Sequence, residues 1–122
     1  MEVKAIAKGV RQSPRKVSVV AGLVRGRMVS DALTILDHTP RRSALAVRKA
    51  IASAAANATH NHNIKPDTLR ITEINVTAGP RIKRFRPAAH GRALPFQRKS
   101  SHILVKVTGD VREKKVKKVE EK

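Results

Sequence analysis

The chain has 122 residues, of which 27 are Lys or Arg and 9 are Asp or Glu, so its formal net charge is +18. Hydrophobic residues make up 40% of the chain and aromatic residues only 2%, which allows one modest core of small aliphatic side chains. Charge repulsion on this scale opposes a compact fold and indicates an anionic partner, with nucleic acid as the first candidate and a membrane surface as the second. No apolar run approaches the ~20 residues of a membrane-spanning helix, and the absence of cysteine excludes disulfides and thiolate metal sites.

The first predicted elements are a strand and a helix. Residues 1–12 alternate loosely between apolar and polar side chains, which predicts a short edge strand with lysine on its polar side. A helix is expected to follow, with Ser13 as its N-cap, Pro14 at its first position and Gly26 just past its end. The inward-facing side chains would be Val3, Ala5 and Ala7 of the strand and Val17, Val20, Ala21 and Val24 of the helix.

Two further helices are predicted in the middle of the chain. The second is short, begins at a Ser30 or Asp31 cap and ends near His38. The third is long and covers about residues 40–60, with Thr39 as its cap. It is rich in alanine, which has the highest helix propensity and lets a helix lie close against a neighbouring element.

The last elements predict a long hairpin over about residues 69–110. In its first arm, residues 69–77, the apolar pattern slips in phase between Ile71 and Ile74, which indicates a bulge. The second arm covers residues 101–107 and alternates regularly, as a strand with one buried face does. The inward face of the second arm would be Ile103, Val105 and Val107.

Residues 80–99 form the extended tip of this hairpin and hold five arginines, two lysines and no carboxylate. Because Pro80, Pro87 and Pro95 cannot donate hydrogen bonds to a ladder, we expect RNA to replace cross-strand bonds near the tip. A segment this basic, without an apolar face, is predicted to need a polyanion to become ordered.

Together these elements predict an α+β fold. It comprises a small antiparallel sheet of three strands packed with three helices, a long protruding β-hairpin and a flexible C-terminal tail. Residues 1–110 would form a single domain. Residues 111–122 hold six cations and three acids without a helical apolar stripe, and we expect this basic tail to be disordered.

The sequence contains no recognisable catalytic constellation. Its acids are scattered, and it has no glycine-rich phosphate loop, so we expect neither enzymatic activity nor a cofactor. His60 and His62 are two residues apart with no further ligand close by, and a polar loop explains them better than a metal site.

The basic residues instead indicate binding to the backbone of a nucleic acid. Phe85 and Phe96 are the only aromatics, which disfavours a base-stacking sheet, and a helix-turn-helix within residues 14–60 would leave the hairpin without a role. Arginine suits phosphate because its planar fork can bind two oxygens at once. A solvated polar face explains any one cation but not the whole set. The predicted RNA-binding residues are Arg11, Arg15, Lys16, Arg25, Arg27, Arg81, Lys83, Arg84, Arg86, His90, Arg92, Arg98 and Lys99.

Several motifs of the chain resemble one family. Lys83, Gly91-Arg92-Ala93 and residues 102–107 (His-Ile-Leu-Val-Lys-Val) resemble the signature of bacterial protein twenty-two of the large ribosomal subunit. Residues 13–16, the alanine-rich helix and residues 78–80 (Ala-Gly-Pro) also look like that family. The resemblance covers about residues 5–110. One departure is that the family usually carries a basic residue where this chain has Ala88, and often another where it has His90, so the tip here is less cationic.

The resemblance implies a compact α+β domain near the tunnel exit of the subunit, with a hairpin that lines the nascent-peptide tunnel. It implies a cytoplasmic protein whose partners are large-subunit rRNA, neighbouring large-subunit proteins and the nascent polypeptide, without a membrane or a second copy of itself. The family is also linked to macrolide resistance, because the hairpin helps to shape the tunnel where those drugs bind. Carried over by position, the tunnel-lining tip would be Ile82, Lys83, Arg84, Phe85, Arg86, Ala88, Ala89, His90, Gly91 and Arg92.

Two other functions stay open at this point. One is a free-standing nucleic-acid-binding regulator, and the other is a basic membrane-active or secreted polypeptide. The membrane alternative requires a strongly amphipathic basic helix with bulky apolar residues, and the alanine-rich helix is too weakly apolar for that role.

Overall fold

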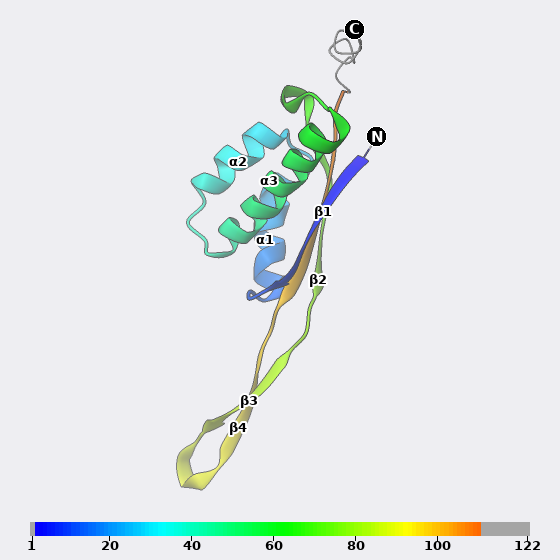
Figure 1. Ribbon diagram of the computed structural model, residues 1–122. Helices are drawn as coiled ribbons and strands as arrows, with labels where there is room; N and C mark the ends of the chain where they lie inside the picture. The colour runs from blue at the N-terminus through cyan, green and yellow to red at the C-terminus, as the bar shows by residue number, and fades with distance from the viewer. Residues whose placement is uncertain (1, 111–122) are drawn as a thin grey trace, which may run out of the picture.

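A computed structural model describes residues 2–110 and confirms the predicted α+β class. Within these residues, three α-helices accompany a three-stranded sheet and a separate two-stranded sheet (Figure 1). The tail over residues 111–122 lies outside the described residues. In chain order the elements are β1 (Glu2–Val10), α1 (Pro14–Val24), α2 (Val29–Asp37), α3 (Ser43–His62), η1 (Pro66–Thr68), β2 (Arg70–Ala78), β3 (Ile82–Pro87), η2 (Ala89–Gly91), β4 (Ala93–Arg98) and β5 (Ser101–Thr108).

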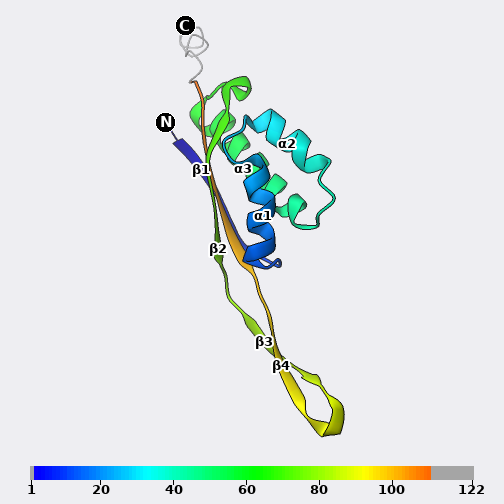
Figure 2. The same cartoon turned by 180° about the vertical axis from the view of Figure 1, so that it is seen from behind.

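The three-stranded sheet is antiparallel, with β5 between β1 and β2. All three helices lie on one face of it, as the two opposite views show (Figures 1 and 2). The helix α3 lies over β1 and β5, α1 lies over β2, and α2 packs on α3. The predicted inward face of β5 is fully buried in this interface, through Ile103, Val105 and Val107.

The predicted bulge in β2 is confirmed. The register against β5 shifts between Ile71 and Glu73, so Thr72 has no direct partner in the ladder. Its hydroxyl instead donates to the carbonyl oxygen of Lys106 at 3.1 Å. The extra residue brings the apolar side chains before and after it to the same buried side. Beyond the bulge, Ile74 pairs with Val105 and Val76 pairs with Ile103.

The helix α1 forms as its sequence predicts. Pro14 is its first residue, and the Ser13 hydroxyl accepts a hydrogen bond from the backbone N–H of Lys16 at 3.4 Å. The helix ends at Val24, shortly before Gly26, which adopts a left-handed φ of 80°. Its buried residues are the predicted Val17, Val20, Ala21 and Val24.

The predicted cap of α2 is wrong. The helix begins at Val29 after Met28, without a side-chain cap, and Ser30 and Asp31 lie inside its first turn. The reason is a tertiary contact that the local sequence does not encode. The backbone N–H of Val29 donates to the carbonyl oxygen of Leu69 at 3.0 Å, so the chain before β2 sets where the helix starts.

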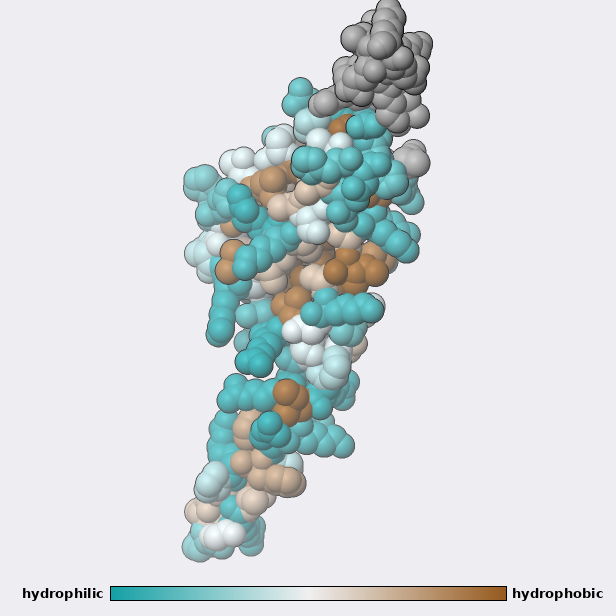
Figure 3. All heavy atoms as spheres, in the orientation of Figure 1, coloured by the Kyte–Doolittle hydropathy of each residue, from teal (hydrophilic) through white to brown (hydrophobic). Residues whose placement is uncertain are grey.

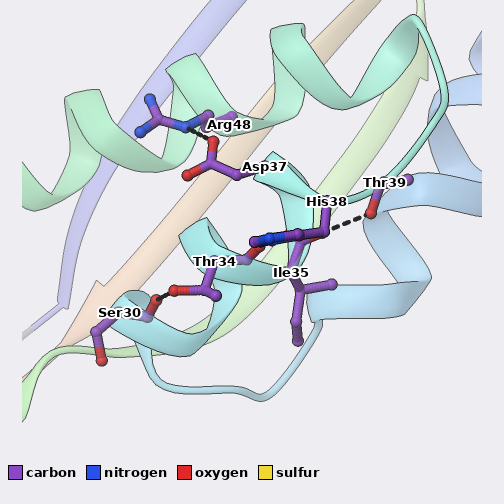
Figure 4. Close-up of polar contacts among 7 residues, drawn as sticks. All are labelled: Ser30, Thr34, Ile35, Asp37, His38, Thr39 and Arg48. Atoms are coloured by element: carbon purple, nitrogen blue, oxygen red, sulfur yellow. Dashed lines mark hydrogen bonds and ion pairs between the residues drawn. The ribbon is translucent and has the colours of Figure 1, made fainter.

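The predicted start of α3 is also wrong. This helix begins at Ser43 and extends to His62, where Asn63 follows in the left-handed conformation with φ 54°. Thr39 serves the preceding helix, because its hydroxyl donates to the carbonyl oxygen of Ile35 at 2.7 Å (Figure 4). Thr39 therefore belongs to the end of α2, and it lies four residues before Ser43, too far from the first turn of α3 to cap it.

The end of α2 is held by further side-chain contacts (Figure 4). The Thr34 hydroxyl donates to the carbonyl oxygen of Ser30 at 3.1 Å, and Nδ1 of His38 lies 2.9 Å from the carbonyl oxygen of Thr34. Arg48 of α3 forms an ion pair with Asp37. Both side chains of this pair are exposed, so we expect it to contribute at most about 1 kcal/mol.

Small aliphatic side chains make the contact between α3 and the sheet. Ala50, Ala54 and Ala58 recur every four residues and are buried on one stripe of the helix. Because alanine occupies so little space, the helix axis can lie close to β1 and β5. The buried core contains no aromatic residue, and both phenylalanines lie outside it.

The strands β3 and β4 leave the rest of the molecule as a narrow projection (Figures 1 and 2). We call residues 80–99 the extension and residues 2–79 with 100–110 the body. The extension has no buried residue, which agrees with its predicted lack of an apolar core. A turn closes it, with His90 in the left-handed conformation at φ 62°.

The prediction that prolines prevent strand pairing near the tip is wrong. The two strands pair continuously, and Pro95 lies opposite Phe85 while Pro87 lies opposite Ala93. In a two-stranded ribbon, alternate residues of each strand direct their N–H groups outward, away from the partner. A proline can occupy such an outward position without removing a ladder hydrogen bond.

The packing of α3 can be tested by adding volume at a buried alanine. We expect Ala54→Leu to lower the free energy of unfolding by about 1–3 kcal/mol, because the added atoms overfill the space against the sheet. Ala56→Leu is the matched control, since Ala56 is exposed on the same helix and should change stability by less than about 0.5 kcal/mol. Denaturant unfolding of the free protein measures both. Equal stability of the two variants would contradict the packing.

Candidate nucleic-acid interface

The cations of the extension have no carboxylate partners among residues 2–110. The ion pairs found in this part of the chain are Arg48 with Asp37 and Lys106 with Glu73, all within the body. Hydrophilic side chains cover much of the visible surface of both body and extension (Figure 3). The seven cations of the extension are therefore available to an external anion.

The pairing of β3 with β4 separates the side chains of the extension into two faces. Directly opposed residues of antiparallel strands project to the same side, and the side alternates along each strand. One face, which we call the arginine face, carries Ile82, Arg84, Arg86, Leu94, Phe96 and Arg98. The other carries Lys83, Phe85, Pro87, Ala93, Pro95 and Gln97.

Phe96 organises the arginine face. The Cζ atom of Arg86 lies 5.0 Å from the centroid of its ring, and that of Arg98 lies 5.5 Å away. Both distances are within the range of a cation–π interaction, which limits the rotamers of these long side chains. Phe85 is on the other face and is 72% exposed, so the two aromatics have different environments.

A groove of about 840 Å³ lies where the extension leaves the body, and we call it the neck groove. One wall is the turn between β1 and α1, together with the start of α1. The other wall is the base of the extension, and the loop before α3 adds one side chain. The lining residues include six cations and no carboxylate: Arg11, Lys16, Arg42, Arg84, Arg98 and Lys99. Such a groove concentrates positive potential and favours an anionic ligand.

The chain is closely packed at the neck beside this groove. The backbone N–H of Gly79 donates to the carbonyl oxygen of Ser100 at 2.9 Å, and the Ser100 hydroxyl donates to the carbonyl oxygen of Pro80 at 2.6 Å. A Cβ atom on Gly79 would lie 2.7 Å from the Ser100 hydroxyl oxygen. His102 accepts a hydrogen bond at Nδ1 from the N–H of Gly9 at 3.1 Å, which ties the end of β1 to the same region.

The structure sorts the predicted RNA-binding residues into three groups. Arg25 and Arg27 use their guanidinium groups within the body, where they donate to the carbonyl oxygens of Ile74 at 2.8 Å and Leu23 at 3.0 Å. A second group converges at the neck groove, namely Arg11, Lys16, Arg84, Arg98 and Lys99. The remaining residues are Arg15 on α1 and Arg81, Lys83, Arg86, His90 and Arg92 along the extension.

Sequence reasoning missed Arg42 as a member of the site. It lies just before α3, next to other basic residues, and local patterns give it the ordinary role of a solvated cation. The structure brings it to the neck groove together with Arg84 and Arg98 of the extension, which are more than 40 positions away in the sequence. Only the packing of α3 against the sheet creates this proximity.

The described residues offer no metal centre and no membrane span. Within residues 2–110, no three His, Cys, Asp or Glu side chains are grouped closely enough to hold a metal ion. No helix in this part of the chain has the length and apolar character needed to cross a membrane.

Comparison with known proteins identifies the family. A family model described as ribosomal protein L22p/L17e matches residues 5–108. The chain belongs to this family. Among curated relatives, proteins named large ribosomal subunit protein uL22 from Desulforamulus reducens and Oceanobacillus iheyensis are 49% and 48% identical over 108 residues, and one from Clostridium tetani is 47% identical over 107 residues. Each alignment covers 88% of this chain and 96% of the relative.

Membership of the L22p/L17e family confirms two predictions from the sequence. The resemblance to protein twenty-two of the large subunit is correct, and the chain is a ribosomal protein with a structural role and not an enzyme. The family match spans both the body and the extension, so the helices, the sheet and the basic projection all belong to the shared architecture.

The packing at the neck predicts opposite effects for two Gly→Ala substitutions. Gly79→Ala should lower stability by about 1 kcal/mol or more, because its Cβ displaces the Ser100 hydroxyl from its hydrogen bond to Pro80. Gly22→Ala in α1 should raise stability by about 0.5–1 kcal/mol, because its Cβ meets no atom within 4 Å and alanine favours the helix. Denaturant unfolding measures both. Stabilisation by Gly79→Ala would contradict the close packing at the neck.

Proposed function

We propose that this protein binds large-subunit rRNA through its basic surfaces and its extension, supports assembly of the subunit and lines the nascent-peptide exit tunnel. As a member of its family it is a structural constituent of the large ribosomal subunit, in the cytoplasm. The observation that carries the finer proposal is the extension itself. It is a paired projection with seven cations, no carboxylate and no buried residue.

The chemistry of the extension suits the backbone of a folded RNA. Among the paired residues, three arginines lie on the arginine face and Lys83 lies on the other face, while the remaining three cations flank the ends of the strands. Arginine dominates, and its guanidinium can donate two parallel hydrogen bonds to one phosphate. The extension buries no residue of its own, and neutralisation of its charge by phosphates favours a fixed position.

The tunnel assignment rests on the resemblance and on the dimensions of the extension. At about 3.3 Å per residue, the ten residues from 80 to 89 span about 30 Å, enough for the tip to lie far from the body. We infer that residues 82–92 form part of the tunnel wall and meet the nascent polypeptide, while the body contacts rRNA and neighbouring proteins. Residues 1–110 then act as a single domain, in one copy and not as a homo-oligomer. The uncharged Ala88 makes this tip less basic than is usual.

The phosphate contacts of the extension are tested by the salt dependence of rRNA binding. Replacing Arg84, Arg86 and Arg92 with alanine should reduce the steepness of the fall of log affinity with log salt by about 2–3. The reason is that each phosphate contact releases counterions from the RNA on binding, and the variant forms three fewer contacts. The control variant replaces three exposed body cations, Arg41, Lys49 and Lys65, with alanine, and we expect it to change the slope by less than about 1. An unchanged slope in the extension variant would show that these arginines do not contact phosphate.

The tunnel placement is tested by deleting residues 82–84 from β3. An odd-numbered deletion in one strand exchanges the two faces of the residues that follow and moves the turn relative to β4. We expect ribosomes that assemble and translate, with a reshaped tunnel wall and an altered macrolide response. Replacing the same three residues with alanine keeps the register and should leave the wall in place. A density map of the deletion ribosome with an unaltered tunnel lining would refute the placement.

Cofractionation with ribosomes tests whether the protein is incorporated into the large subunit or has one of the two alternative functions that the sequence left open. The protein should remain with large subunits through a high-salt wash, because many phosphate contacts act together. A free-standing nucleic-acid-binding regulator or a membrane-active polypeptide would be released or found elsewhere. Loss of the protein from washed subunits would overturn the proposed function.

A further inference from the structure

We propose that the neck groove holds one continuous segment of RNA backbone, so that a single stretch of nucleotides contacts both the body and the extension and fixes the direction of the extension. This inference rests on the rRNA binding proposed above. It adds the location of one binding site, the neck groove. It also states that the ligand there is one continuous RNA segment and that this segment holds the extension in a fixed direction.

The first observation is convergence of charge from three distant parts of the chain. Arg11 comes from the turn after β1, Arg42 from the loop before α3 and Arg98 from the end of β4. None of the six lining cations forms an ion pair with a carboxylate of residues 2–110. Bringing these cations together without counter-charges raises the free energy of the free protein, and an anion in the groove relieves that repulsion.

The second observation is the polar lining between the cations. The neutral polar residues Gln12, Ser13 and Ser100 line the groove between its cations. Among residues 2–110, the Gln12 side-chain oxygen already accepts from the Ser43 hydroxyl at 3.3 Å, which leaves the amide hydrogens of Gln12 to face a ligand. An RNA backbone requires this combination, because cations bind its phosphates and neutral donors and acceptors bind its riboses.

The third observation is continuity with the arginine face. Ile82, Arg84 and Arg98 belong both to that face and to the lining of the groove. A backbone segment that lies in the groove can therefore continue past Arg86 toward the tip without leaving a basic surface. Phe96 supports this path, because it holds Arg86 and Arg98 on the same side of the ribbon.

The mechanical consequence follows from the neck. Protein contacts between the body and the base of the extension consist mainly of the two strands themselves and the hydrogen bonds of Gly79 and Ser100. A two-stranded ribbon can bend about such a narrow connection. An RNA segment bound to both walls adds a third connection, off the axis of the ribbon, and thereby removes this freedom.

Directed cleavage tests whether one RNA segment touches both walls. The chain has no cysteine, so Gln12→Cys and Gln97→Cys each place a single iron–EDTA tether on one wall of the groove. In reconstituted large subunits we expect hydroxyl radicals from both tethers to cut the same short stretch of rRNA. Ser30→Cys, on α2 at the other end of the body near the bridge of Met28 to Arg70, should not cut that stretch.

The possible results separate this inference from the function on which it rests. Cuts at unrelated rRNA segments from the two walls, or labelling of a ribosomal protein without RNA cleavage, would overturn the inference. If neither wall cuts RNA but a tether at Ala89→Cys in the turn does, the groove is empty of RNA while the proposed rRNA binding stands. If no tether cuts RNA and the protein does not incorporate, both fail.

Arg42 gives an independent test. Arg42→Gln should reduce the slope of log affinity against log salt by about 1, because it removes one phosphate contact. Arg41→Gln is the matched control, since Arg41 precedes it in the chain, carries the same charge and does not line the groove. Equal slopes for the two variants would show that net charge alone matters and would overturn a specific role for the groove.

Discussion

The structure depends on the central strand β5. It is hydrogen-bonded to β1 on one side and β2 on the other, and its inward side chains are the fully buried centre of the core. The same strand follows β4 after only two residues, so one continuous arm runs from the core into the extension. The position of the basic projection is therefore set by the strand that is held most firmly by the body.

The core that supports this arrangement is small and entirely aliphatic. Alanine on α3 and valine on α1 bring the helices close to the sheet, which compensates for the absence of large aromatic side chains. Both phenylalanines lie in the extension, where one organises arginines and the other is exposed. Aromatic residues in this chain thus serve the basic projection and not the stability of the body.

The charge of the chain explains why the molecule consists of a folded body and a separate basic extension. A net charge of +18 on 122 residues cannot be neutralised within the chain, and few of the cations meet a carboxylate among residues 2–110. The body tolerates the repulsion because its buried aliphatic surface favours folding. The extension has no such surface, and its charge density suits a ligand with one negative charge per nucleotide. Ribosomal membership supplies a partner with that property.

Much of the fold could be predicted because the deciding interactions are local. The Ser13-Pro14 start of α1, its valine stripe, the bulge after Ile71 and the inward face of β5 all follow from capping chemistry and from periods of 3.6 and 2 residues. These features depend on neighbours within a few positions, which a sequence displays directly. The extension was also evident, because seven cations without a carboxylate cannot form a core.

Tertiary structure alone decided the features that depend on distant partners. The start of α2 is set by the carbonyl of Leu69, and Thr39 caps the end of α2 because the helices pack as they do. The prolines fit the ribbon because of their register, which no local rule specifies. The neck groove joins Arg11, Arg42 and Arg98 from separate segments, and the sequence could count these cations but could not show that they share one site. Composition indicated an anionic partner for this chain, whereas the packing of α1 and α3 beside the base of the extension decided where its charges converge.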